Sequence, residues 1–367
     1  MPLSEQRGGG ELMFWHLMLH GRGKGMDFVA VFFGEGPLVE QTRELGITVY
    51  VVQAGRMREL HRMGKAIGEI TGIIRREGVG LVVGWMGTAQ LYGGPAAKRA
   101  GVPNLWYQLG IPLDKSLLDR IAAALPANAI LTLSKAGREA QRGVSSKRPL
   151  GLVYPGVELE NYDPAALPSR EEARRKVGIP PDGPLIGIVG RLQKWKGMHV
   201  LVDAMPLIQK RYPDARCVIV GGQHAAEPEY EGIVAQQIKE KGLSERVTMV
   251  GLQKNVPEWM QAMDVIVHAS DHEPFGMVVI EAMALEKPVI AGDAAGPTEI
   301  ITPEENGLLA PYGDPEKIAA AILRYLDDPA FAVRVGKAAR TRALDFTAQK
   351  YADNLVAAFK ELAGLPA

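Results

Sequence analysis

Two glutamates eight positions apart are the residues whose types and spacing most directly suggest chemistry. They bracket the stretch EPFGMVVIE, which runs from residue 273 to residue 281. Gly276 would let the backbone approach a ligand closely, and the amides after it would form a helix N-terminus, which favours an anion. Because Glu273 is itself an anion, ligand hydroxyls explain it better than phosphate does, and Glu281 could accept hydrogen bonds from a second pair of hydroxyls. The pattern suits a ligand with sugars at both ends of a diphosphate. The alternative is a helix N-terminal charge at Glu273 and a solvated helix residue at Glu281.

A second motif, VGRLQKWKG at 189–197, lies about eighty residues upstream of the first. An expected strand ends at Gly190, and Arg191 and Lys196 flank the turn that follows. Arginine offers a fork of donors to phosphate oxygens, and lysine offers a point charge. Both stand at the carboxyl end of a strand, where ligands bind in open α/β sheets. The alternative is two solvated loop cations.

The composition is that of a globular protein. The chain has 367 residues, 47% of them hydrophobic, and its single cysteine, Cys217, excludes an internal disulfide framework and suits a reducing cytosol. No apolar run approaches the roughly 20 residues that span a bilayer, and the N-terminus has no signal-peptide stretch. The net charge is zero, but residues 1–155 carry 19 basic and 12 acidic side chains (+7), which leaves 23 and 30 (−7) for the rest. This asymmetry is either chance scatter or a sign that the first half meets something anionic.

Short β-branched runs alternate with longer helical patterns along the whole chain, which predicts parallel sheets covered by helices on both faces. The expected strands are 28–33, 47–52, 81–86, 104–108, 129–134, 185–190, 216–222, 247–251, 265–270 and 288–292. An irregular, proline-bearing segment at 151–169 reads as a linker. We therefore predict an α/β chain of two doubly wound domains that face each other across a cleft. The domains would be 1–155 and 156–345, with a C-terminal helix at 346–367 that packs back toward the first.

Together these motifs resemble the family 4 retaining glycosyltransferases of the GT-B fold. The resemblance covers most of the chain and includes GRLQKWKG, VIVGG, EPFGMVVIEAMALEKPVIA, GPTEII, ENGLLAPYGDPEKIAAAI and VYPGVELENY. It implies a Rossmann-like N-terminal domain that binds the acceptor and a C-terminal domain that binds a nucleotide sugar.

The resemblance assigns roles to the residues named above. It implies that Glu273 lies over the transferred sugar, that Arg191 and Lys196 bind the diphosphate, and that Glu281 binds the ribose. These are the expected catalytic and donor-binding residues. The further expected donor contacts are Gly9 and Gly10 of a flexible loop (RGGGE, 7–11), Gly190, Leu252, Phe275, Gly276, Met277 and Thr298.

The implied function is a retaining transfer of a sugar from a UDP- or GDP-sugar to an acceptor hydroxyl. The acceptor would be a sugar, a lipid-linked glycan or a small molecule. We expect no nucleic-acid partner, no cofactor and no metal, since the sequence has no Asp-x-Asp element and no tight His/Cys cluster. A non-catalytic nucleotide-sugar-binding or scaffolding protein is the alternative; a phosphorylase or an epimerase of the same fold is the alternative among enzymes.

The chain departs from the family in two places. The segment MPLSEQR before the glycines is too polar and short for the family's central first strand, so residues 1–7 are not expected to form an interior strand. Either the start of the chain lies upstream, or the sheet has closed up, or another segment fills the slot. Gln108 and Leu109 stand where a histidine is expected, and His16 and His20 share a face of the first helix, which favours a packed or solvated face.

A basic helix is expected at 55–77, with apolar residues between its arginines and lysines. It would either cover a sheet or dock on an anionic membrane, as related lipid-glycosylating enzymes do. The expected location is therefore the cytoplasm, with peripheral binding at the inner membrane face as the variant.

Overall fold

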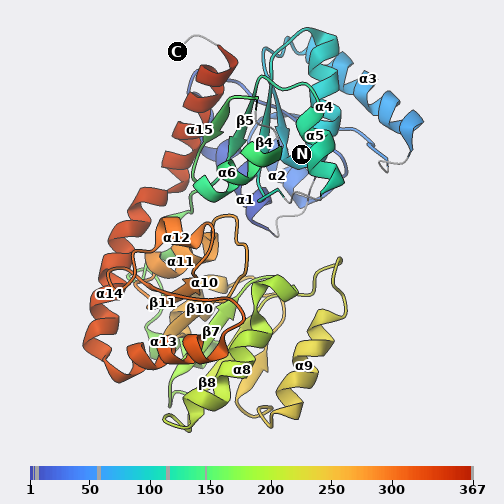
Figure 1. The fold of residues 1–367 in the computed structure, drawn as a ribbon. Coiled ribbons are helices and arrows are strands. Elements are labelled where there is room, and N and C mark those ends of the chain that lie inside the picture. The colour runs from blue at the N-terminus through green and yellow to red at the C-terminus, as the bar shows by residue number, and fades with distance from the viewer. Residues whose placement is uncertain (3, 5–7, 56–58, 113–115, 145–146, 365–367) are drawn as a thin grey trace. The chain divides into compact units, whose positions relative to one another are not determined.

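The structure is a computed structural model that describes the whole chain except residues 3, 5–7, 56–58, 113–115, 145–146 and 365–367. The chain divides into two compact units. Unit 1 consists of Met1–Gly156 and Thr347–Ala367, and unit 2 is Val157–Phe346. Each unit has its own parallel β-structure covered by helices (Figure 1).

Unit 1 contains a two-stranded and a four-stranded parallel sheet, ordered β1-β2 and β3-β4-β5-β6. Its strands are β1 (Val29–Phe32), β2 (Thr48–Val51), β3 (Val82–Trp85), β4 (Asn104–Gln108), β5 (Ala129–Thr132) and β6 (Leu150–Leu152). Its helices are α1 (Gly9–His20), α2 (Pro37–Glu44), α3 (Leu60–Arg76), α4 (Met86–Ala100), α5 (Leu117–Ala124), α6 (Lys135–Val144) and α15 (Ala348–Ala363), the last of which packs against α1.

The two sheets of unit 1 are bridged by helix α1 rather than by a strand. The Phe14 ring of α1 lies 5.4 Å from the Phe32 ring of β1 and 5.6 Å from the Trp85 ring of β3, edge-on to both. Among the described residues no strand pairs β1 with β3. Met1 lies beside β1, because its ammonium donates to the Val31 carbonyl at 2.6 Å and its carbonyl accepts from the Phe33 amide at 3.1 Å. The predicted lack of the family's first strand concerns residues 1–7, of which 3 and 5–7 lie outside the described residues, and it stays a prediction. The prediction that the run 28–33 is buried on both faces is wrong: β1 alternates between half-buried and buried residues, because one of its faces is only partly covered.

The predicted basic helix is α3, which covers part of the core of unit 1. The apolar residues of α3 (Ala66, Ile67, Ile70, Ile73, Ile74) are buried, and α3 packs against α4. Its charged residues from Arg62 to Arg76 are exposed. This apolar stripe is therefore occupied by protein, which favours the sheet-covering interpretation of the predicted helix.

Unit 2 contains one six-stranded parallel sheet with the order β12-β11-β10-β7-β8-β9. Its strands are β7 (Leu185–Val189), β8 (Arg216–Val220), β9 (Val247–Met249), β10 (Val265–His268), β11 (Val289–Gly292) and β12 (Leu308–Ala310). Its helices are α7 (Arg170–Lys176), α8 (Met198–Gln209), α9 (Tyr230–Glu240), α10 (Val256–Ala262), α11 (Met277–Ala284), α12 (Pro297–Ile300), α13 (Pro315–Asp327) and α14 (Pro329–Ala343), with short 3₁₀ turns η1 (Leu159–Tyr162), η2 (Lys194–Lys196) and η3 (Leu344–Phe346).

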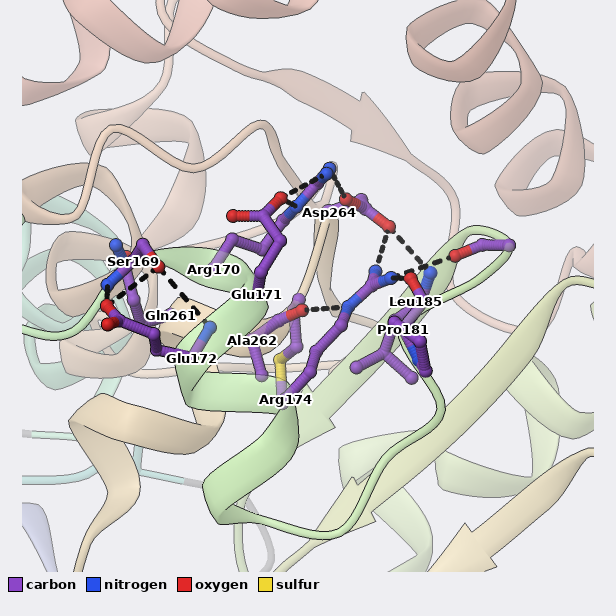
Figure 2. Close-up of polar contacts among 12 residues, drawn as sticks. Ser169, Arg170, Glu171, Glu172, Arg174, Pro181, Leu185, Gln261, Ala262 and Asp264 are labelled. Carbon is purple, nitrogen blue, oxygen red and sulfur yellow. Dashed lines mark hydrogen bonds and ion pairs between the residues drawn. The ribbon is translucent and has the colours of Figure 1, made fainter.

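A buried arginine holds together the amino-terminal ends of the two central strands of this sheet (Figure 2). Arg174 of α7 is 2% exposed and donates to Asp264 Oδ2 at 2.6 Å and to the Ala262 carbonyl at 3.0 Å. The same Oδ2 accepts the amide of Leu185 at 2.7 Å, and Asp264 Oδ1 accepts from Arg170 at 2.6 Å. Since Leu185 begins β7 and Asp264 precedes β10, this network fixes the two central strands, whose opposite ends carry the predicted site.

Candidate functional site

The carboxyl ends of β7 and β10 bring two of the predicted charges into direct contact. Lys196, in η2 after β7, forms an ion pair with Glu273 Oε2 in the loop after β10. The two side chains are 13% and 12% exposed. Gly197 ends the η2 turn with φ +76°, and a Cβ at that position would overlap the carbonyl of Ala269. The turn and the loop are therefore in backbone contact, and this closeness holds the ion pair.

A histidine and a serine complete the cluster around Glu273. His268, the last residue of β10, places Nε2 3.1 Å from Glu273 Oε2, and Ser270 Oγ lies 3.2 Å from the same nitrogen. His268 Nδ1 is buried and has no hydrogen-bond partner among the described residues. A carboxylate can only accept a hydrogen bond, so the donor in the contact with Glu273 is His268 Nε2–H.

The charge state of Glu273 follows from these contacts. Burial by itself would raise the pKa of this carboxyl, but the Lys196 ammonium and the His268 ring hold the pKa well below its ordinary range. An opposite charge and a hydrogen bond to the charged form both favour ionisation. Glu273 is therefore a fixed carboxylate, and it is not a proton donor.

The second acid of the motif is buried in a different environment. Gly276 caps helix α11 with φ +109°, a conformation that residues with a side chain rarely adopt, and α11 carries Glu281 inward, where it is 7% exposed. Burial raises the pKa of Glu281 to about 7, and a hydrogen bond from Tyr162 of η1 opposes that rise. The alternative that Glu281 is a solvated helix residue is wrong.

The other predicted cation lies at the open side of the turn. Arg191 is exposed, and its Nη1 is 3.5 Å from His224 Nε2, beyond a good hydrogen bond. Glu227, further along the same loop as His224, accepts from the Lys194 amide at 2.8 Å and from Gln193 Nε2 at 3.2 Å. The loop after β8 thus braces the backbone of η2, while the Arg191 guanidinium faces solvent.

The remaining predicted residues of unit 2 line the same carboxyl edge in different ways. Gly190 follows β7 and its amide donates to the Val220 carbonyl at 2.9 Å, while Leu252 is 62% exposed after β9. Phe275 is 2% exposed, so only its backbone can meet a ligand. Met277 is the first residue of α11, and Thr298, exposed in α12, donates to the Ala295 carbonyl at 2.7 Å.

The predicted glycine loop of unit 1 differs from the expectation. Gly9 and Gly10 form the first turn of α1 and not a loop, because α1 begins at Gly9. The Gly10 carbonyl accepts from Trp85 Nε1 at 3.0 Å, which ties this turn to the carboxyl end of β3. Arg7, at the start of RGGGE, lies outside the described residues. Gln108, predicted in place of a histidine, donates to Asp119 Oδ1 at 3.0 Å.

Sequence reasoning missed three residues that the structure brings to the two acids, namely His268, Ser270 and Tyr162. The first two close the strand VIVHAS, and their position at the carboxyl end of a central strand was a usable signal. Tyr162 lies more than a hundred residues before Glu281, in the segment interpreted as a linker, so no local pattern could have paired them.

Neither a metal-binding cluster nor a membrane-spanning helix occurs among the described residues. These residues contain no group of three or more His, Cys, Asp or Glu side chains that could hold a metal ion. No helix in that part of the chain is long and apolar enough to cross a bilayer.

Comparison with known sequences connects this site to a family. The family model described as glycosyl transferases group 1 matches residues 169–342. D-inositol 3-phosphate glycosyltransferase of Corynebacterium urealyticum is 33% identical over 228 residues, which are 60% of this chain and 53% of that protein. The lipopolysaccharide core biosynthesis mannosyltransferase LpsB of Rhizobium meliloti is 26% identical over 217 residues, 58% of this chain and 61% of that protein. The chain thus spans little more than half the length of these relatives.

Comparison with solved structures concerns the fold. Anabaena Alr3699/HepE, crystallised in complex with UDP, matches with a TM-score of 0.85 at 23% identity, over 98% of this chain and 100% of that one. Sucrose-phosphate synthase from Thermosynechococcus elongatus matches with a TM-score of 0.81 at 24% identity, over 99% and 96%. The predicted fold class is confirmed.

Proposed function

Residues 169–342 belong to the glycosyl transferases group 1 family, as the sequence resemblance predicted, and from this premise we propose that the chain is a retaining glycosyltransferase. It moves a sugar from a nucleoside diphosphate sugar to an acceptor hydroxyl. The observation that carries the proposal is the Lys196–Glu273–His268 cluster at the carboxyl edge of the matched domain. A fixed carboxylate beside a fixed cation suits a reaction that separates charge.

The proposed chemistry follows from where charge develops. Breaking the bond between the sugar and the phosphate builds negative charge on the leaving diphosphate and positive charge on the sugar ring. Arg191, Lys196 and the amides at the start of α11 would stabilise the first, and the Glu273 carboxylate would stabilise the second. His268 keeps the Glu273 oxygen in place when Lys196 turns toward phosphate. The leaving phosphate can take the acceptor's proton, so no separate base is required of unit 2.

The proposed donor is a UDP-sugar. HepE, a neighbour in fold, has been crystallised with UDP-glucose, which supports uracil as the base. We assign ribose binding to Glu281. Burial raises the pKa of this carboxyl, and hydrogen bonds from the ribose hydroxyls to the carboxylate lower it again. We further assign unit 2 to the donor and unit 1 to the acceptor, and Gly9 and Gly10 stay predicted donor contacts.

The experiment that tests the proposal measures UDP released from UDP-glucose. GDP-mannose and GDP, which carry guanine in place of uracil, are the controls for the nucleotide base. Wild-type protein should be stabilised against heat by UDP and should release UDP from UDP-glucose, faster when a suitable acceptor is present. Stabilisation by UDP with no release under any acceptor panel would favour the non-catalytic binding protein instead. No stabilisation by any nucleotide would overturn both.

A further inference from the structure

Phe346 occupies one of the two places where the chain passes between the units. The chain passes from unit 1 to unit 2 after Gly156 and returns after Phe346. Within unit 2 the Val157 amide donates to the Phe346 carbonyl at 2.9 Å. Within unit 1 a Cβ on Gly156 would overlap the Thr347 carbonyl. The two crossings are therefore joined to each other on both sides of the boundary.

The ring of Phe346 packs on the loop that carries the first acid. It meets the Phe275 ring edge-on at 5.5 Å and 70°, and both rings are nearly fully buried. Phe275 is two residues from Glu273 and next to Gly276. Its backbone also packs so closely on Gly296 that no Cβ fits there, and the Gly296 amide donates to the Glu273 carbonyl at 3.0 Å. The position of the loop therefore depends on what holds Phe275.

An arginine fixes the other side of the same ring. The Arg342 guanidinium lies 4.7 Å from the Phe346 ring centroid. It donates through Nη2 to the Glu299 carbonyl at 2.9 Å and through Nε to the Ile300 carbonyl at 3.3 Å. These carbonyls end α12, the helix that carries Thr298. The Phe346 ring thus contacts Phe275 in the acid loop and, through Arg342, the end of α12. The backbone of Phe346 itself forms the crossing from unit 2 back to unit 1.

We propose that Phe346 is a positioning residue that couples the donor loop to the chain crossings. Close-packed interiors transmit small displacements instead of absorbing them. A ligand held at Glu273 and Gly276 shifts Phe275, and Phe346 passes that shift to Val157; in return, the crossing holds Glu273 in its working position. The inference rests on the proposed function, because it needs a donor at this loop.

Phe331 provides a matched control within the same unit. Its ring is 3% exposed, against 4% for Phe346, it stacks on Tyr325 at 5.4 Å, and Arg324 lies 4.3 Å from its centroid. It thus has the same burial and the same kinds of contact, but it belongs to α14, and its ring contacts among the described residues are Tyr325, Arg324 and Arg334, none of which lies in the acid loop. If Phe346 were only a core residue, the two leucine variants would behave alike.

The test is amide hydrogen exchange with and without UDP in wild type, Phe346→Leu and Phe331→Leu. In wild type, UDP should slow exchange about 10-fold both at Gly276–Val279 and at Val157. Phe346→Leu should keep the first effect and lose the second, whereas Phe331→Leu should keep both at a similar loss of Tm. With UDP-glucose, Phe346→Leu should lower kcat about 10-fold and leave KM within about 2-fold.

Two outcomes overturn the coupling: UDP slows Gly276–Val279 but not Val157 in wild type, or Phe346→Leu and Phe331→Leu give the same pattern. If UDP slows neither segment in wild type, the donor assignment falls, and the inference falls with it. Should Phe346→Leu fail to fold, Arg342→Met removes the guanidinium that lies against the Phe346 ring. That variant should reduce the UDP effect at Val157 while that at Gly276–Val279 persists, and an unchanged effect at Val157 would contradict the coupling.

Discussion

The two units differ in how their strands are held together. Unit 2 has one continuous sheet, and the charged network around Arg174 fixes its two central strands at their amino ends. Unit 1 has its strands in two separate sheets, and the Phe14 ring of α1 packs between them. A continuous sheet positions side chains at its carboxyl edge rigidly, and that is where the proposed donor chemistry lies. A divided sheet bridged by side chains buries fewer backbone hydrogen bonds, which leaves unit 1 the more adaptable one.

The largest effect is expected from removing the Arg174 side chain. Arg174→Met would remove the guanidinium from Asp264, whose side chain is 16% exposed, and leave the carbonyls of Ala262, Pro181 and Gly183 without this donor. Breaking a largely buried ion pair in this way costs about 3–5 kcal/mol. The loss should appear as earlier unfolding of unit 2 in denaturant. Arg170 also bonds Asp264 but is half exposed, so Arg170→Met should cost under about 1 kcal/mol. Equal losses in the two variants would show that burial does not set the strength of this network.

A pH-dependent effect is expected at Glu281, whose pKa burial raises from 4.5 to about 7. Between these values the folded state binds the extra proton. The stability that Glu281 contributes is therefore full below pH 4.5 and is lost as the pH rises through 7. Glu281→Gln should thus be more stable than wild type at pH 8 by on the order of 3 kcal/mol, with no such gain at pH 4.

The check on Glu281 is thermal unfolding of the ligand-free protein across this pH range. The exposed Glu305 offers a control, since Glu305→Gln should track wild type at every pH. A Glu281→Gln curve parallel to that of wild type would contradict the buried, protonated carboxyl.

Loss of the cation in the site should affect turnover. Lys196→Ala removes a charge that meets the leaving diphosphate, and the expected loss in kcat is about 100-fold, or about 2.7 kcal/mol. The neighbouring Lys194 is exposed and its side chain forms no ion pair with another described residue, so Lys194→Ala provides the control variant. Release of UDP from UDP-glucose measures both. Wild-type turnover in Lys196→Ala would remove this residue from the mechanism.

The smallest effect concerns the units themselves. Amides of β1 (Val29–Phe32) should exchange about 10-fold faster than those of β7 (Leu185–Val189), because β1 lies in a two-stranded sheet. β10 (Val265–His268) should behave like β7. Equal and strong protection of β1 and β7 would mean that packing on α1 protects β1 as fully as neighbouring strands protect β7.

Much of this architecture could be predicted from sequence. Each predicted strand overlaps an observed one, since β-branched runs between helices carry a strong signal, and the carboxyl-edge motifs located the acids and cations. Three things had no local signal. Arg174 lies in REEARRK, where nothing distinguishes the buried arginine from its solvated neighbours. Tyr162 reaches Glu281 only through tertiary packing. The partial burial of β1 depends on which elements cover its two faces, and a strand's own residues do not specify that.

The most direct test of the account compares the binding of UDP and uridine by calorimetry. The diphosphate contacts predict that wild-type protein prefers UDP to uridine by at least about 100-fold. A variant with both Arg191→Gln and Lys196→Gln should lose most of that preference, and Glu281→Gln should weaken UDP and uridine by the same factor. A preference for UDP that survives in the double variant would contradict the assignment of the diphosphate to the carboxyl edge of β7.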